Sequence, residues 1–302
     1  MPAAVSANPR TSGVSTVLRA ADYDLDATLD SGQAFRWRRA GEAWEGIVGG
    51  QWFRLRQVGT RLEAETATPL PASDTLTQYL GLNDDLTAII ARFPPDPPLR
   101  SAVATCRGLR LLRQDPWECL ASFVLSSTKQ IVQIRQIVET LCDRYGEPVC
   151  VPGPGAIGRS FPSAARLARC TELELRDCRM GFRARYLRAV AMRVAAGDPC
   201  LTALPGMPLE EARAALVSLP GVGRKIADCV LLFSLGFRRA FPVDVWVMRA
   251  LQDLYFGGRT IAQRRLLEFT DSHFGPEAGY AQQYLFHHIR MEAGRVPRSV
   301  RR

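Results

Sequence analysis

The stretch Leu219-Pro220-Gly221-Val222-Gly223-Arg224-Lys225 joins two apolar helical runs at residues 210–217 and 226–235. A connection this short predicts a tight helical hairpin. Gly221 and Gly223 can adopt positive φ angles and let the backbone come close to a ligand. The free N–H groups at the start of the second helix point into the same space, which suits a phosphate. The stretch therefore predicts a hairpin that grips a nucleic-acid backbone without reading its sequence.

Lys225 lies in the first turn of the second helix. The chain has only two lysines, Lys129 and Lys225, so arginine supplies nearly all of the 39 basic side chains. Arginine stays protonated and cannot act as an amine nucleophile, whereas lysine can. Lys225 is therefore either a nucleophile or, more simply, a surface lysine that touches phosphate.

Asp244 follows Lys225 by nineteen residues, in the segment Phe241-Pro242-Val243-Asp244. An apolar helical pattern begins directly after it, so we expect Asp244 to be the N-cap of a helix. A capping carboxylate can also face a cleft, where it stabilises a developing cation or accepts a proton. The two roles are compatible.

Composition limits the protein classes. The chain has 302 residues, a net charge of +9 and 47% hydrophobic residues, and no apolar run approaches the length of a membrane span. We see no signal-peptide pattern and expect a reducing compartment. Eight scattered cysteines form no Cys-x-x-Cys pair and are expected to be mostly buried free thiols. The positive charge fits a polyanionic partner.

The pattern along the chain divides it into four parts. A proline-rich segment at residues 93–99 can neither continue a helix nor enter a sheet interior, so we place a domain boundary there. We expect a disordered N-terminus, an antiparallel sheet domain, a helical domain and a basic tail, at residues 1–15, 16–98, 99–294 and 295–302. Strands are predicted at residues 35–37, 44–48, 51–55 and 61–65.

The hairpin with its lysine and the spaced aspartate resembles the helix-hairpin-helix-GPD superfamily of base-excision DNA glycosylases, and the 8-oxoguanine DNA glycosylases in particular. Further similar stretches are Ser31–Trp37, Arg110–Pro116, Gly181–Tyr186 and Gly279–Phe286. The resemblance implies an α+β fold, in which an N-terminal antiparallel, TBP-like sheet domain packs on a two-lobed helical body with a cleft between the lobes. It also implies double-stranded DNA containing 8-oxoguanine as the partner.

The resemblance also implies a pocket for a base rotated out of the duplex. Phe286 and Cys229 match the residues on the two faces of the base, and Gln282 matches the amide that reads its Watson–Crick edge. Gly32 matches a glycine whose carbonyl accepts the N7–H that only the oxidised base carries. Taken alone, Phe286 and Cys229 would be core residues and Gly32 a turn glycine.

The chemistry implied by the family begins at Lys225. Its amine would attack C1′ of the sugar, expel the base and form a Schiff base, and β-elimination would then nick the strand. Asp244 would stabilise charge at the sugar, and Gly221, Val222 and Gly223 would hold a phosphate. A cation bound by hairpin carbonyls would meet Val217, Leu219 and Val222. We expect no required cofactor and no iron–sulfur cluster, because no cysteine follows Cys229.

The side of the site that faces the opposite strand departs from the better-known eukaryotic members. Those carry an asparagine run where this chain has Thr128, Lys129 and Gln130, and an arginine in place of Gln133. We expect Lys129 to enter the gap left by the base or to meet phosphate. Phe182 and Arg183 do match a wedge residue and a reader of the orphaned cytosine. A family histidine–carboxylate pair is replaced by the apolar pair Trp246 and Ile289.

Two alternatives remain open at this point. One is an alkylated-purine glycosylase of the same superfamily, which would use the aspartate without the lysine. The other is a non-catalytic DNA-binding module, which would need neither Lys225 nor Asp244. We further expect a monomer with no membrane association, in a bacterial cytoplasm at the nucleoid or, if the source is eukaryotic, in the nucleus.

Overall fold

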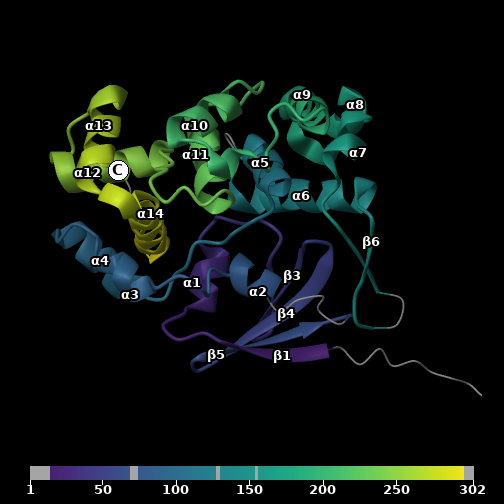
Figure 1. Ribbon diagram of the computed structural model, residues 1–302, viewed down its shortest axis with the longest axis horizontal. Helices are drawn as coiled ribbons and strands as arrows, with labels where there is room; N and C mark the ends of the chain where they lie inside the picture. The colour runs from purple at the N-terminus through teal and green to yellow at the C-terminus, as the bar shows by residue number, and fades with distance from the viewer. Residues whose placement is uncertain (1–13, 69–73, 127–129, 154–155, 296–302) are drawn as a thin grey trace, which may run out of the picture.

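The computed structural model describes residues 14–68, 74–126, 130–153 and 156–295. It has an α+β architecture, with a sheet at one end of the molecule and a body of helices above it (Figure 1). The sheet is antiparallel and five-stranded, in the order β1-β5-β4-β3-β2. Its strands are β1 (Val14–Arg19), β2 (Arg38–Ala40), β3 (Ala43–Val48), β4 (Gln51–Val58) and β5 (Arg61–Thr66).

One face of the sheet is covered by the helices α1 (Leu25–Asp30) and α2 (Asp74–Tyr79). In β5 the burial alternates with the period of a strand, and Leu62 and Ala64 point into a core that also contains Leu29. Trp37 is buried in this core, and its indole Nε1 donates a hydrogen bond to the Tyr79 hydroxyl at 2.9 Å. A small apolar core thus holds the sheet to its two helices.

Two sequence predictions for this region are wrong. Residues 35–37 form no strand, because Phe35 and Trp37 point into two different cores instead of onto one face of the sheet. Strand β1 begins at Val14, which pairs with Thr66, so the expected disorder of residues 1–15 is wrong for Val14 and Ser15. Residues 1–13, and residues 296–302 of the expected basic tail, lie outside the described part of the chain.

Along the chain, the helices of the body follow the sheet in three successive stretches. The first helices after the sheet are α3 (Leu86–Ile90), α4 (Pro97–Thr105), α5 (Pro116–Leu125) and α6 (Ile131–Tyr145). A two-stranded ribbon and a helical lobe follow, with β6 (Pro148–Cys150), β7 (Ile157–Arg159), α7 (Ala164–Ala168), α8 (Glu172–Leu175), η1 (Arg176–Met180) and α9 (Arg183–Ala195). The remaining elements are η2 (Leu204–Gly206), α10 (Leu209–Val217), α11 (Arg224–Phe233), α12 (Val245–Phe256), α13 (Gln263–His273), η3 (Gly275–Glu277) and α14 (Ala278–Arg295).

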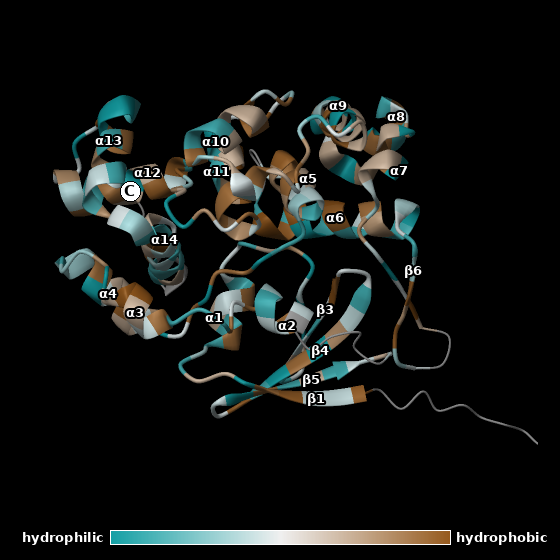
Figure 2. Cartoon of the chain, viewed as in Figure 1, coloured by the Kyte–Doolittle hydropathy of each residue, from teal (hydrophilic) through white to brown (hydrophobic). Residues whose placement is uncertain are grey.

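Helices α5 and α11 form the centre of the body, and Figure 2 shows them carrying mostly hydrophobic residues. Every residue from 226 to 233 of α11 is buried, as is every residue from 119 to 125 of α5. Burying one large apolar side chain stabilises the folded state by about 1.5–3 kcal/mol. The packing of α5 against α11 therefore stabilises the body and fixes the ends of both helices. Asp115 caps α5 and accepts a hydrogen bond from the Glu118 N–H at 2.8 Å.

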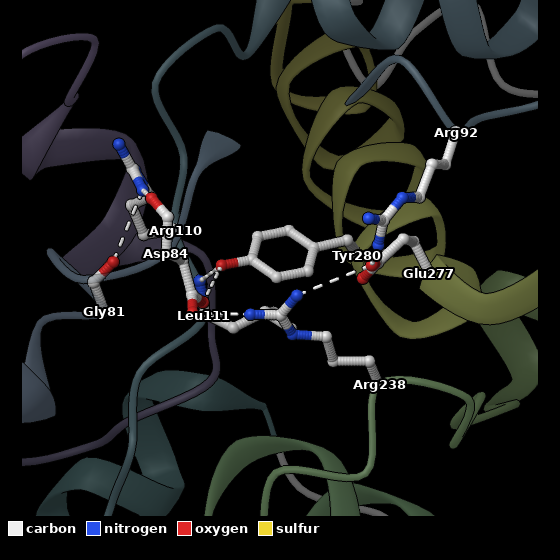
Figure 3. Close-up of polar contacts among 8 residues, drawn as sticks. All are labelled: Gly81, Asp84, Arg92, Arg110, Leu111, Arg238, Glu277 and Tyr280. Carbon is white, nitrogen blue, oxygen red and sulfur yellow. Dashed lines mark hydrogen bonds and ion pairs between the residues drawn. The ribbon is translucent and has the colours of Figure 1, made fainter. Parts of the chain in front are cut away.

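A charged network fastens α14 to the segment that follows the sheet (Figure 3). Asp84 accepts hydrogen bonds from the Tyr280 hydroxyl at 2.8 Å and from Arg238 at 2.5 Å. Glu277 pairs with Arg92 at 3.0 Å and with Arg238 at 3.4 Å. These contacts set the position of α14 relative to the rest of the body.

No helix in the described ranges is long and apolar enough to span a bilayer.

Candidate active site

The predicted hairpin is present between α10 and α11. Gly221 has a φ of +76°, and a Cβ at this position would lie 2.6 Å from the Tyr186 ring. The positive φ expected at Gly223 is wrong: this residue caps α11 in an extended conformation, with φ −95° and ψ 177°. No atom lies within 4 Å of where a Gly223 Cβ would be. The absent side chain therefore leaves open space in front of the first N–H groups of α11, where an anion can approach.

Lys225 is the second residue of α11 and is half-buried. Its Nζ lies 3.1 Å from Oγ of Ser126 and 5.1 Å from the centroid of the Phe123 ring. The Ser126 hydroxyl donates its own proton to the Phe123 carbonyl at 2.7 Å, so it accepts a hydrogen bond from the amine. Lys225 is thus held by the C-terminal end of α5 and does not extend into solvent.

Asp244 is the N-cap of α12, as predicted. Its Oδ1 accepts a hydrogen bond from the Val247 N–H at 2.8 Å, a cap worth about 1 kcal/mol. The cap uses only one of the two carboxylate oxygens. Asp244 lines the same cavity as Lys225, which brings a carboxylate and an amine from two helix N-termini to one space.

That cavity has a volume of about 480 Å³, within the range of about 300–1,000 Å³ that is typical of ligand pockets. The six residues predicted for catalysis and base recognition all line it. They are Gly32, Lys225, Cys229, Asp244, Gln282 and Phe286. Gly32 comes from the sheet domain and the others from three helices of the body, so the cavity lies where the two parts meet.

Three cavity residues, from α11 and α14, have the features of a site for a flat, polar ring. Gln282 is only 4% exposed, and its Oε1 has no hydrogen-bond partner among the described residues. Leaving a buried amide oxygen unpaired costs about 1–3 kcal/mol, so a ligand N–H is expected there. Burial raises the pKa of the Cys229 thiol to about 12, so this side chain is a neutral, compact surface. Phe286 is half-buried and supplies an aromatic face.

Gly32 lies beside Phe286, and any larger residue in its place would be strained. It has a φ of +84°, and a Cβ there would lie 2.9 Å from Ile131 and 3.5 Å from Phe286. The glycine therefore brings backbone directly to the cavity wall.

Two of the residues predicted to meet the opposite strand, Phe182 and Arg183, lie outside the cavity, whereas Gln130 lines it. Phe182 is 51% exposed at the start of α9, and the Arg183 guanidinium lies 4.7 Å from the centroid of its ring; neither lines the cavity. Gln130 lies at the cavity rim and caps α6, with its N–H donating to Gln133 Oε1 at 3.1 Å. Thr128 and Lys129 lie outside the described residues.

Sequence reasoning missed several cavity residues. It gave no role to Ser126 or Arg290, and both line the cavity. Trp246 and Ile289 line it as well, and the Trp246 residue is 53% exposed at the start of α12. No local pattern singles out Ser126 or Arg290, because their partners are distant in the sequence.

Comparison with known proteins agrees with this geometry. Residues 16–120 match the model of the 8-oxoguanine DNA glycosylase N-terminal domain. Residues 121–271 match that of the HhH-GPD superfamily of base excision DNA repair proteins.

Individual relatives show the same likeness. The chain is 34% identical to the N-glycosylase/DNA lyase OGG1 of Arabidopsis thaliana, covering 88% of this chain and 77% of the relative. A structure of MBOgg1 in complex with a low affinity DNA ligand superposes with a TM-score of 0.88 at 32% identity, covering 97% of this chain and all of that one. The Clostridium acetobutylicum 8-oxoguanine glycosylase/lyase, in complex with double-stranded DNA containing cytosine opposite 8-oxoG, gives a TM-score of 0.85 at 29% identity, covering 92% and 98%.

Proposed function

Because this chain belongs to the helix-hairpin-helix-GPD superfamily and carries the 8-oxoguanine DNA glycosylase N-terminal domain, we propose that it is a bifunctional DNA glycosylase and AP lyase that excises 8-oxoguanine from duplex DNA. One observation carries the proposal. The amine of Lys225, the carboxylate of Asp244 and the unpaired amide oxygen of Gln282 all face a single cavity.

Recognition requires that the damaged nucleotide leave the base stack and enter this cavity. Phe286 and Cys229 would contact the two faces of the base, and the free Oε1 of Gln282 would accept an N–H from its Watson–Crick edge. The Gly32 carbonyl would accept the N7–H of 8-oxoguanine. Guanine has a bare acceptor at this position, so two acceptors would face each other, at a cost of about 1–3 kcal/mol.

Lys225 would supply the nucleophile. Its nitrogen lone pair attacks C1′, the C1′–N9 bond breaks, and the base leaves with the bonding electrons and gains a proton. Opening of the sugar ring gives a Schiff base, loss of a C2′ proton expels the 3′ phosphate, and the strand is nicked. Asp244 would stabilise the positive charge that develops at the sugar.

The hairpin would hold the DNA backbone while the base is extruded. The open space at Gly223 gives a phosphate access to the N–H groups of α11. Val217, Leu219 and Val222 would bind a cation through their carbonyls. Val217 is the last residue of α10. The carbonyls at the end of a helix lack helical partners and form the negative end of the helix dipole, which attracts a cation. Such a cation would add positive charge beside the phosphate.

We propose that the protein acts as a monomer wherever chromosomal DNA lies, in a bacterial cytoplasm or a eukaryotic nucleus.

Borohydride trapping on a duplex containing 8-oxoguanine tests the proposal. We expect a covalent protein–DNA adduct that Lys225→Gln abolishes. Lys129→Gln is the matched control, since it removes the only other lysine and must still give the adduct even where binding weakens. A DNA-binding module would give no adduct and no free base. An alkylated-purine enzyme that acts without the lysine would free the base and give no adduct.

A further inference from the structure

The turn that contains Gly32 is fixed on both sides of the glycine. The Asp30 carbonyl accepts a hydrogen bond from Arg290 Nη1 at 2.9 Å, and the Ser31 carbonyl accepts one from Gln283 Nε2 at 3.2 Å. On the other side, the Gln33 carbonyl accepts one from Gln114 at 2.6 Å. None of the hydrogen bonds among the described residues uses the Gly32 carbonyl. Its neighbours are therefore held in place while this carbonyl keeps its full capacity to accept.

Two of these three donors belong to α14, the helix that also carries Gln282 and Phe286. Gln283 directly follows Gln282 and is fully buried, with an exposed fraction of 1%. Arg290 lies one helical turn after Phe286, so the two side chains share a face. The helix that presents the base-reading groups thus also sets the position of the turn that faces them.

Arg290 is itself held in place by its contacts with Asp30. Its Nη2 lies 3.6 Å from Asp30 Oδ2, while Arg135 donates to Asp30 Oδ1 at 3.0 Å. The planar guanidinium therefore contacts both the carbonyl and the carboxylate of one residue. Its Nη1 would lie only 3.3 Å from a Cβ at Gly32, so Arg290 packs against the glycine and fixes the residue before it.

We propose that Arg290, with Gln283, is a positioning residue for damage recognition: it holds the Gly32 carbonyl where the N7–H of an oxidised purine can donate to it. The inference rests on the proposed function and adds the residues that make the carbonyl selective. A hydrogen bond weakens steeply when its geometry is lost, so a turn freed from α14 would favour 8-oxoguanine less over guanine.

The test separates base recognition from sugar chemistry. Excision of 8-oxoguanine needs the base to be read, whereas borohydride trapping on a preformed abasic site needs only the amine. Arg290→Met keeps a long apolar side chain and removes every donor. We expect it to slow single-turnover excision about tenfold while trapping on abasic DNA stays within about twofold of wild type. Arg290→Lys keeps one donor group and should recover part of the lost excision rate.

Two further variants complete the design. Arg56→Met removes an exposed arginine that pairs with Glu63 on the sheet, and it should leave both rates unchanged. Gln283→Leu removes the second donor and should also slow excision without slowing trapping on abasic DNA. This variant keeps the inference testable if thermal melts show that the Arg290→Met protein is unfolded.

Excision and trapping that fall together in the Arg290 and Gln283 variants would mean a general loss of structure and would overturn the inference. Unchanged excision would overturn it as well. Wild-type protein that gives no adduct on either substrate would overturn the proposed function and, with it, the inference.

Discussion

The hydroxyl of Tyr280 donates a hydrogen bond to Oδ2 of Asp84 at 2.8 Å, and this contact joins the cavity helix to the segment that follows the sheet (Figure 3). Tyr280 is fully buried, and the charge of Asp84 is balanced by Arg238. Gln282 and Phe286 lie on α14 within two turns of Tyr280. The positions of Gln282 and Phe286 in the cavity wall therefore depend on a polar contact outside the cavity.

Tyr280→Phe should destabilise the protein by about 1.5–3 kcal/mol, because it removes a buried hydrogen bond to a charged group. Urea denaturation measures this free energy. Tyr186→Phe is the control: among the described residues, the Tyr186 hydroxyl bonds only to the exposed Arg185, so a change within about 0.5 kcal/mol is expected. Equal effects of the two substitutions would show that the network in Figure 3 contributes nothing particular to stability.

The two hairpin glycines should respond in opposite ways to alanine. Gly221→Ala should lower stability, because the residue has a φ of +76° and a Cβ would meet the Tyr186 ring at 2.6 Å. Gly223→Ala should leave stability equal or slightly higher, since its φ of −95° suits alanine and the space is open. Its methyl group would instead occupy the place that we propose for a phosphate. We expect weaker duplex binding, measured by fluorescence anisotropy, from a fully stable Gly223→Ala protein.

If the Gly223→Ala protein is stable and still binds duplex DNA tightly, the proposal that the open space at Gly223 receives a phosphate is wrong. A Gly221→Ala protein as stable as wild type would show that the turn can relax away from Tyr186.

The sequence predicted those parts of the site that depend on local pattern. The hairpin, the cap by Asp244 and the helix of Lys225 follow from short-range spacing and were confirmed. The meeting of Gly32 with Phe286 came only from the family resemblance, because no periodicity relates residues so far apart. Ser126 and Arg290 were missed for the same reason: their contacts join residues 99 and 260 positions apart.

The errors in the sheet have a related cause. Alternating aromatic residues at 35–37 predicted a strand, yet Phe35 packs on Phe123 of α5, with 5.4 Å between the ring centroids. Tertiary packing outweighed a local preference there. Val14 and Ser15 belong to β1 because they pair with the end of β5. The small, polar composition of the N-terminus does not reveal this pairing.

Ser126→Ala should slow adduct formation by about tenfold without changing duplex affinity, because the amine loses the hydroxyl that orients it. Ser126→Thr keeps a hydroxyl at the same position and should restore much of the rate. Single-turnover trapping at saturating enzyme measures the effect. Equal rates for the alanine and threonine variants would show that the 3.1 Å contact with Nζ does not orient the amine.

Glu118 should make the stability of the protein depend on pH in the neutral range. Burial raises the pKa of Glu118 from 4.5 to about 7, and Arg36, whose Nη1 lies 4.0 Å away, offsets this only in part. The folded state therefore binds the proton more tightly than the unfolded state. This contribution to stability is complete below pH 4.5 and is lost as pH rises to 7, by at most about 3 kcal/mol.

Glu118→Gln should remove that dependence, because glutamine is neutral at every pH in the same place. The variant should gain stability relative to wild type as pH rises from 5 to about 7.5, and the difference should then stay constant. Urea denaturation at a series of pH values measures it. A difference between the two proteins that is the same at every pH would mean that Glu118 titrates near its ordinary value, and that water reaches its 21% exposed side chain well enough to solvate the charge.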